Sequence, residues 1–436
     1  MRIGLSTRRN AGAAFLALAA LAAVIPAAGA AGAAPRTTGP AASWRATEVY
    51  PVAVSLDSTA HTLKPGAFYG LSCLSTGNCV AGGWYERRTG ASSLGQFRPM
   101  TATESHGTWG LSRRLWLPST KLDPDAGAQV NAISCPSPGW CAAAGQIPAT
   151  GNREYAFVIT ESGGQWNRPH LVQLPSDAQQ APAISEIDGI SCWAPRSCEA
   201  VGWYITKAPT SYVPIAMTES AGHWGRATGL PLHLHPGPNL ARLTSVSCPA
   251  PGWCAAVGTD TFGPASQYIA SVATVLAGGR WSKPAVPSGG RQASLVSVGC
   301  RAAGDCVAVG GAVSTALEHG RWHAVAVGSV VPPDGRPVTS YWPDLTAVSC
   351  TKTACLAGGT YFSNTRDIFP AYVVSYAGGR WRDPVAIGLP GNASAGDDPP
   401  PYQTLDAVSC TTTCTAVGTY TTRTGLLPGW AAAGPG

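Results

Sequence analysis

The fourteen cysteines of this 436-residue chain are the residues whose spacing most clearly indicates chemistry, because they fall into seven close pairs. Five pairs are Cys-x5-Cys, one is Cys-x4-Cys and the last is Cys-x3-Cys. A zinc site needs four converging ligands, whereas these pairs start 50 to 62 residues apart and none is Cys-x2-Cys. An even count at a regular period therefore predicts seven local disulfides. The pairs are Cys73–Cys79, Cys135–Cys141, Cys192–Cys198, Cys248–Cys254, Cys300–Cys306, Cys350–Cys355 and Cys410–Cys414.

Histidines and carboxylates give weaker signals. His233 and His235 flank Leu234, so an extended strand would place both imidazoles on one face, but no third ligand accompanies them. We therefore expect no metal and no cofactor. Two carboxylates about 5–10 Å apart would suffice for glycoside hydrolysis, yet no motif singles out a pair among the 23 acidic residues. The candidate acids in expected loops are Glu86, Asp123, Asp125, Glu154, Glu186, Asp260, Asp344 and Asp367.

Each cysteine pair belongs to a repeat of about 56 residues that has the pattern of four short strands. An apolar-x-small-apolar-Ser stretch leads into the first cysteine, as in Leu345–Cys350, and Ala-Val-Gly follows the second, as in Ala200–Tyr204. A third stretch such as Ala371–Tyr376 follows a variable loop. A Gly turn into a tryptophan strand, as in Gly378–Pro384, completes the unit. The disulfide is expected to link the first strand to the second.

Seven such repeats predict an all-β fold, a seven-bladed β-propeller of four-stranded blades with one disulfide per blade. The seventh repeat ends near Leu427–Ala431 without its tryptophan strand, whereas Ser43–Pro51 resembles that strand. We expect this N-terminal strand to complete the last blade, which would remove two sheet edges. The first strand of each repeat would then line the central channel. Tryptophans in six Gly-x-Trp turns are expected in the core, at Trp109, Trp166, Trp224, Trp281, Trp322 and Trp381.

The chain is expected to divide into a signal peptide (1–33), a linker (34–42) and the propeller (43–436). Arg2, Arg8 and Arg9 precede an apolar run from Ala11 to Ile25, and small-x-small cleavage patterns follow. This run of 15 residues is short for a bilayer span of about 20, so a retained anchor is the alternative rather than the expectation. The mature chain would have 26 basic and 23 acidic residues, a net charge of +3 that argues against a nucleic-acid partner. We expect a secreted, extracellular monomer with no membrane span after cleavage.

The repeat resembles a known class of proteins. Ser-Cys-x5-Cys-x-Ala-Val-Gly followed by Gly-x-Trp is similar to the repeat of secreted actinobacterial propeller proteins, over nearly the whole mature chain. The turn into the tryptophan strand is also distantly similar to the Asp-box of sialidase-like propellers, with Thr103–Trp109 as the nearest copy, although Ser105 stands where the Asp belongs. An Asp-box implies folding rather than catalysis. Phe97–Pro99 is similar to the arginine motif of sialidases, but the partner arginines of that family are not identifiable here.

Two sets of residues are candidates for a binding site on the loop face, the face that would carry the long loops between second and third and between fourth and first strands. Polar residues recur at the second position of the first strand, and aromatics follow the second strand or stand in loops. Aromatic faces suit sugar rings or protein partners, but both sets are also consistent with strand entry and loop packing. The polar set is Asn131, Asp188, Thr244, Thr346 and Asp406; the aromatic set is Trp84, Tyr85, Trp203, Tyr204, Tyr361, Phe362 and Tyr420.

We therefore predict a non-catalytic binding module for a glycan or cell-envelope component. The alternatives are a glycoside hydrolase or lyase of sialidase-like type, and a scaffold that binds an extracellular protein. No Gly-x-Ser-x-Gly, His-Glu-x-x-His or P-loop motif favours another enzyme class.

Overall fold

The computed structural model describes the chain in twelve stretches, and all its described elements are strands. The stretches are residues 44–49, 62–88, 96–117, 127–207, 210–232, 240–263, 268–287, 294–325, 343–361, 369–382, 384–394 and 402–435. The chain separates into two units, Met1–Ala41 and Ala42–Gly436. The expected signal peptide and linker lie outside the described residues, so those boundaries stay predictions. No described segment forms a helix that is long and apolar enough to cross a membrane.

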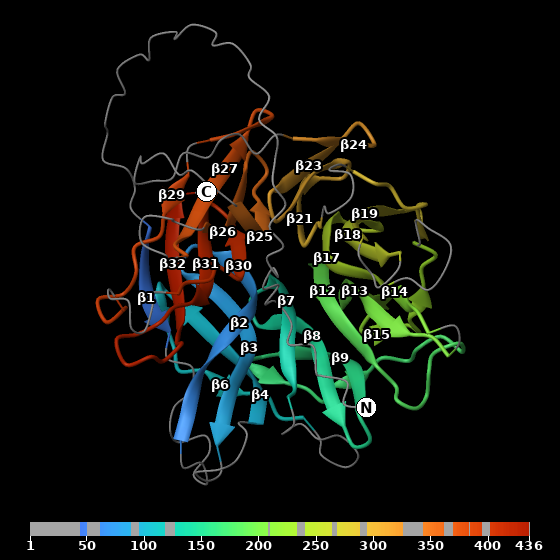
Figure 1. The fold of residues 1–436 in the computed structure, drawn as a ribbon, viewed down its shortest axis with the longest axis horizontal. Helices are drawn as coiled ribbons and strands as arrows, with labels where there is room; N and C mark the ends of the chain where they lie inside the picture. The colour runs from blue at the N-terminus through green and yellow to red at the C-terminus, as the bar shows by residue number, and fades with distance from the viewer. Residues whose placement is uncertain are drawn as a thin grey trace, which may run out of the picture. The chain divides into compact units, whose positions relative to one another are not determined.

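The second unit is built from short strands that run in hairpins along the chain (Figure 1). The strands are β1 (Arg45–Val49), β2 (Thr62–Ser75), β3 (Asn78–Arg88), β4 (Gln96–Ser105), β5 (Thr108–Trp109), β6 (Arg113–Arg114), β7 (Gln129–Ser137), β8 (Trp140–Ala149), β9 (Arg153–Ser162), β10 (Gln165–Trp166), β11 (His170–Leu171), β12 (Ser185–Ala194), β13 (Ser197–Ile205), β14 (Tyr212–Ser220), β15 (His223–Trp224), β16 (Thr228–Gly229), β17 (Leu240–Ala250), β18 (Trp253–Phe262), β19 (Tyr268–Ala277), β20 (Arg280–Trp281), β21 (Ser297–Ala302), β22 (Asp305–Gly310), β23 (Val313–Glu318), β24 (Arg321–Ala324), β25 (Pro343–Cys350), β26 (Cys355–Tyr361), β27 (Ala371–Ala377), β28 (Arg380–Trp381), β29 (Val385–Ala386), β30 (Ala407–Cys410), β31 (Thr413–Thr419) and β32 (Gly429–Pro435).

The sheets correct the predicted fold class. We expected seven blades, each a separate sheet of four strands. The described strands instead form six hydrogen-bonded sheets, two of four strands, three of five and one of nine. The nine-stranded sheet arises because a parallel bridge from Tyr212 to Leu240 joins β14 to β17, and the extra strands arise because the chain after a Gly-x-Trp turn pairs a second time with its third strand. The prediction of seven uniform, separate four-stranded blades is therefore wrong, and the fold is an all-β propeller with less regular sheets.

The first strands of the disulfide hairpins contact one another in a closed cycle. Each first strand touches the first strand of the next hairpin, and the last touches β2; the order is β2, β7, β12, β17, β21, β25 and β30. At the outer edge of the last hairpin, β1 pairs antiparallel with β32, with Arg45 opposite Ala433 and Val49 opposite Gly429. The two ends of the unit therefore meet in one sheet, where β1 lies beside β32 in Figure 1.

All fourteen cysteines form disulfides, in the seven pairs that their spacing predicts. In most pairs the two cysteines stand directly opposite each other in the ladder between first and second strands, as Cys192 and Cys198 do. Seven disulfides fit an extracellular protein, because such bonds persist in oxidising compartments.

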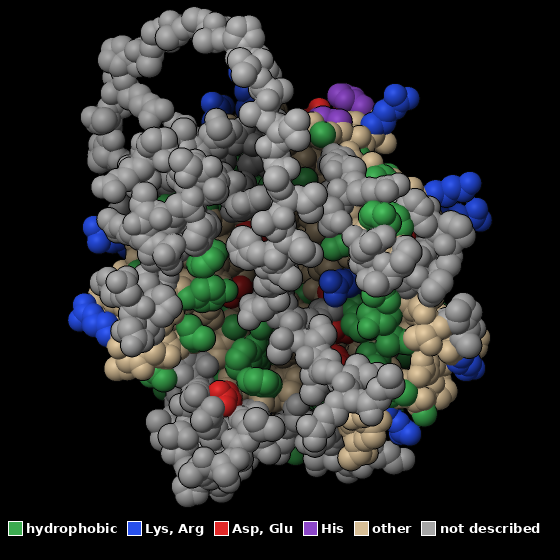
Figure 2. All heavy atoms as spheres, viewed as in Figure 1, with side chains coloured by type: hydrophobic (Ala, Val, Ile, Leu, Met, Phe, Trp, Pro, Cys, Tyr) green, Lys and Arg blue, Asp and Glu red, His purple; other side chains and the backbone are tan. Residues whose placement is uncertain are grey.

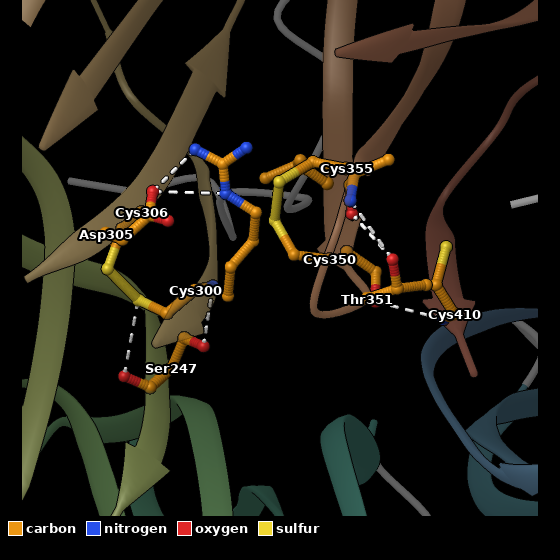
Figure 3. Close-up of a disulfide and its surroundings, with 12 residues drawn as sticks. Ser247, Cys300, Asp305, Cys306, Cys350, Thr351, Cys355 and Cys410 are labelled. Atoms are coloured by element: carbon orange, nitrogen blue, oxygen red, sulfur yellow. Dashed lines mark hydrogen bonds and ion pairs between the residues drawn. A yellow bond between two sulfur atoms is a disulfide. The ribbon is translucent and has the colours of Figure 1, made fainter. Parts of the chain in front are cut away.

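The serine before the first cysteine holds neighbouring hairpins together. The backbone N–H of Cys300 donates a hydrogen bond of 3.1 Å to Oγ of Ser247 in the preceding hairpin (Figure 3). The equivalent bond recurs at five other junctions, with lengths of 2.9–3.0 Å: Ser72 to Cys135, Ser134 to Cys192, Ser191 to Cys248, Ser349 to Cys410 and Ser409 to Cys73. The Ser-Cys motif thus connects neighbouring hairpins, a role that the repeat pattern alone did not reveal.

One junction departs from this rule, and the sequence departs with it. Gly299 stands where the serine belongs, and a Cβ there would lie 3.0 Å from Sγ of Cys350. The connection moves two residues along the strand, where Val348 N–H donates to Ser297 Oγ at 3.0 Å. The adjoining sheets therefore stay linked although the motif is broken.

Apolar side chains from neighbouring sheets pack into shared cores. Leu115, from the outer segment of one repeat, is buried with Val130, Ile147 and Phe157 of the next. The six Gly-x-Trp tryptophans are half-buried, and each lies against one of these cores. Their expected structural role agrees with this packing.

Candidate binding site at the seam of the loop face

Four of the five polar residues predicted to ring the channel lie at β-bulges: Asn131, Asp188, Thr244 and Thr346. The ladder of the last hairpin begins at Ala407, one residue after the fifth, Asp406. In five of the ladders between a first and a second strand, the register skips one residue of the first strand. That residue has no cross-strand partner. The skipped residues are Tyr69, Asn131, Asp188, Thr244 and Thr346. The sequence pattern therefore found a real structural position, and its role in ligand binding stays a prediction.

Several of these side chains contact the next sheet. Asn131 is buried and donates through Nδ2 to Glu186 Oε1 at 2.8 Å and to the carbonyl of Ile187 at 2.9 Å. Thr244 and Thr346 also donate to carbonyls just before the first strand of the following hairpin. Both amide hydrogens of Asn131 are thus used inside the protein, which gives this position a role in joining sheets.

The aromatics after the second strand are mostly buried. Tyr204 and Tyr420 are almost fully buried, and their hydroxyls donate to Asp177 Oδ1 at 2.9 Å and to Asn392 Oδ1 at 2.8 Å. Burial, together with Asp177, raises the pKa of the Tyr204 hydroxyl. Tyr85 and Tyr361 are buried too. These tyrosines anchor loops, and their predicted contact with a ligand is untested.

The two predicted tryptophans differ in exposure. Trp203 is 7% exposed, and its ring stacks on Tyr212 at a centroid distance of 4.5 Å. Trp84 is half-buried and meets Phe97 edge-on at 4.5 Å. Of the two, Trp84 keeps the more accessible ring.

The candidate acids are scattered. Glu186 and Asp260 are buried, Glu86 and Glu154 are half-buried, and Asp344 is exposed. Asp123, Asp125, Asp367, Phe362, His233 and His235 lie outside the described residues. Among the residues that the structure describes, no three His, Cys, Asp or Glu side chains come together as a metal site.

One group of described residues combines exposed aromatic rings with carboxylates. Phe369 precedes β27 and Tyr402 lies in the segment before β30; these residues form a parallel bridge, with ring centroids 6.1 Å apart and planes inclined at 61°. The rings stay 41% and 38% exposed. We call the group formed by Phe369, Tyr402, Thr404, Asp344 and Asp406 the seam site, because it joins the β25–β29 sheet to the sheet that holds β1.

The carboxylates of the seam site act on Tyr402. Burial, then Asp406 and Asp344, raise the pKa of its phenol, so the group stays an O–H donor at neutral pH. Asp344 is accessible to solvent, yet the surrounding protein desolvates it enough to raise its own pKa. Thr404 Oγ1 donates to Asp406 Oδ2 at 3.1 Å, which fixes the direction of that carboxylate.

Sequence reasoning found only part of this site. Asp406 and Asp344 were candidates for different reasons, whereas Phe369 and Tyr402 were not singled out. The two aromatics stand in irregular segments 33 residues apart and belong to no repeat position. Their pairing depends on how two loops meet at the seam.

The fold and this geometry define a class, the all-β propellers with a disulfide in each repeat. No protein-family model matches the chain, and no curated protein matches it. Among solved structures it is similar to a protein of unknown function from Dyadobacter fermentans, with a TM-score of 0.46 and 8% identity over 90% of this chain and 98% of that one.

Two further similarities are of the same strength. A PL25 ulvan lyase has a TM-score of 0.45 and 9% identity over 91% of this chain and 95% of that one. A subtype N11 neuraminidase-like protein from a flat-faced bat influenza virus has a TM-score of 0.40 and 10% identity over 91% and 94%. At these values the similarities carry no argument about this chain.

Proposed function

We propose that this protein binds a glycan at the seam site. The observation that carries the proposal is the pair of exposed rings, Phe369 and Tyr402, beside the carboxylates of Asp344 and Asp406. A sugar presents C–H groups that pack on aromatic faces and hydroxyls that donate to carboxylates. Because the nearby charges are negative, we infer that the bound sugar is neutral or carries an amine.

The phenol of Tyr402 has a defined part in this proposal. Its raised pKa keeps the hydroxyl protonated, so it donates a hydrogen bond to a sugar oxygen while the ring contacts the sugar face. The fixed carboxylate of Asp406 accepts from a second hydroxyl. Two such hydrogen bonds would orient the sugar as well as contribute to its affinity.

The test is binding of the mature protein to a panel of neutral and amino-sugar cell-wall fragments, followed by calorimetry on the best one. We expect Tyr402→Ala and Phe369→Ala each to weaken binding about tenfold, in the range of a lost aromatic contact. Tyr402→Phe should lose less, because the ring remains. Phe97→Ala is the matched control, since Phe97 is 37% exposed, close to the exposure of the two seam rings, and lies on β4 outside the site. Equal affinity for all four variants would exclude the seam site.

A second candidate function is glycoside hydrolysis, and one observation favours it. Asp344 has a raised pKa while Asp406 accepts a hydrogen bond, and both act on Tyr402. Glycoside hydrolysis needs two carboxyl groups in different environments, one acting as acid and the other as base or nucleophile. Mass spectrometry of each bound fragment distinguishes the functions, because hydrolysis changes the mass of the sugar. If a product forms, Asp344→Asn should abolish it while the fragment is still retained.

A further inference from the structure

The charged residues of this protein are sorted between inside and outside. Seven carboxylates of the described chain are buried: Glu104, Glu161, Glu186, Asp188, Glu199, Glu219 and Asp260. Exposed Lys and Arg side chains instead recur on the outermost strand segment of every repeat. The net charge of the chain hides this arrangement, because the two sets nearly cancel.

Nine basic residues make up what we call the basic girdle. All nine are exposed, and they lie on β1, β6, β20, β24 and β28 or in the few residues after an outer tryptophan. They are Arg45, Arg113, Arg168, Arg226, Arg280, Lys283, Arg321, Arg380 and Arg382. Figure 2 shows the result on one face, where most Lys and Arg side chains stand at the margin and acidic and apolar side chains lie further in.

The girdle has free charge. Within the described part of the chain, none of the nine forms an ion pair. Glu48 is the carboxylate described on these outer segments, and it accepts from Asn392 Nδ2 at 2.9 Å rather than from an arginine. Arg226 donates through Nε to the carbonyl of Leu174 at 3.2 Å, which leaves its charge without a carboxylate. Exposed guanidinium and ammonium groups that form no ion pair are available for sulfates, carboxylates or phosphates of a partner.

The distribution favours a polymer over a small anion. The girdle residues are spread at one or two per repeat and do not converge on one point, so a small anion would meet one or two charges at a time. A linear polyanion can engage several segments at once.

The neighbourhood of the girdle favours a sugar polymer. Beside Arg113 the outer segment exposes Trp116 (69%) and Leu111 (59%), and Leu171 follows Arg168 on the next outer segment. Aromatic faces stack on sugar rings while guanidinium groups bind their acidic substituents. We propose that the basic girdle binds a linear anionic polysaccharide, at a surface separate from the seam site.

The experiment compares dextran sulfate with uncharged dextran of the same length on the mature protein, between 50 and 200 mM NaCl. We expect binding of dextran sulfate alone, weakening at least tenfold across this range as salt screens the girdle. A triple variant that combines Arg280→Ser, Arg321→Ser and Arg380→Ser should bind dextran sulfate at least tenfold more weakly than the wild type. Its affinity should also depend less steeply on salt. Tyr402→Ala should leave this binding unchanged, which separates the girdle from the proposed function of the seam site.

A matched control removes the same charge elsewhere. Lys207, Lys352 and Arg423 are exposed and lie outside the outer segments, so Lys207→Ser, Lys352→Ser, Arg423→Ser should keep most of the affinity. An equal loss in this control would show that net charge alone acts and would overturn the proposal. Trp116→Ala should weaken dextran sulfate several-fold and leave duplex DNA unaffected; DNA bound as tightly as dextran sulfate would overturn the assignment to a polysaccharide.

Discussion

Glu199 is a buried carboxyl that links the acidity of the medium to the stability of the fold. It lies on β13, is 1% exposed, and accepts a hydrogen bond of 2.7 Å from Thr218 Oγ1 on β14. Burial raises its pKa from 4.5 to about 7, although the bond from Thr218 acts in the opposite direction. The folded state therefore binds a proton on Glu199 more tightly than the unfolded chain does.

This raised pKa gives a signed prediction. The stabilising effect of protonated Glu199 is complete below pH 4.5 and is lost as pH rises through about 7. Compared with Glu199→Gln, the wild type should lose about 2–3 kcal/mol of unfolding free energy between pH 5 and pH 8. Urea denaturation at both pH values measures this, with Glu154→Gln as a control at a half-buried acid. A parallel pH dependence of wild type and Glu199→Gln would contradict the prediction.

For individual residues, the sequence predicted which positions recur in the repeats better than it predicted what their side chains do. The spacing of Tyr204 and Tyr420 after the second strand was visible, but their partners Asp177 and Asn392 lie 27 and 28 residues earlier in irregular loops. An aromatic side chain serves loop packing and ligand binding equally well, so its residue type did not decide between them. The seam site went unnoticed for a related reason, since Phe369 and Tyr402 belong to no repeat.

The second strand of each hairpin has a glycine that the bulge in the first strand requires. At Gly202 a Cβ would lie 1.9 Å from the carbonyl oxygen of Glu186, two residues before the bulge at Asp188. The Ala-Val-Gly glycines of the other repeats meet the same carbonyl at 1.8–2.0 Å: Gly83, Gly145, Gly258, Gly310, Gly359 and Gly418. The motif is therefore a matched pair of bulge and glycine on adjoining strands.

Gly202→Ala should consequently be costly. The methyl group would meet backbone rather than a flexible side chain, so the hairpin must shift, and we expect a loss of about 3 kcal/mol or more. Gly391→Ala is the control, because nothing lies within 4 Å of a Cβ there. Thermal unfolding of both variants compares them, and a Gly202→Ala protein as stable as Gly391→Ala would refute the pairing of bulge and glycine.

The hairpins could be predicted from the sequence, because local disulfides and turn residues specify them within one repeat. The partition of strands into sheets could not. It depends on a single bridge, Tyr212 to Leu240, and on where the outer segments pair again. Such contacts are set by the geometry between repeats, which no motif encodes.

At the level of the whole molecule, we expect the contact between the two ends of the second unit, where β1 pairs with β32, to stabilise the fold. Trp44, just before β1, is 2% exposed and packs so closely on Gly434 that a Cβ there would lie 2.3 Å from the indole. Trp44→Ala should remove about 3–5 kcal/mol of stability. Trp116→Ala, which changes an exposed ring, should change stability by less than about 0.5 kcal/mol. The midpoints of urea denaturation measure both effects. Similar midpoints for the two variants would argue against a stabilising role of the β1–β32 contact.

Charge is the property of the whole molecule that composition represents worst. A net charge of +3 argues against a polyanionic partner only if the charges are mixed. The fold separates many of them, with seven described carboxylates buried and nine exposed bases on the outer segments. Summed composition loses this information, because it takes no account of which strand of the repeat each charge occupies.

The pairing of β1 with β32 also imposes a delay on the folding of the newly synthesised chain. Thr47 on β1 donates a hydrogen bond to the carbonyl of Ala431 on β32, and the two residues are 384 positions apart in the sequence. At about 5–20 residues per second, synthesis separates their appearance by roughly 20–80 s. During that interval β1 lacks its partner strand, β32. Each hairpin between a first and a second strand, in contrast, can form once its own residues have been synthesised. β1, the first of the described strands, is thus among the last to pair, and a chaperone that shields it would act during this delay.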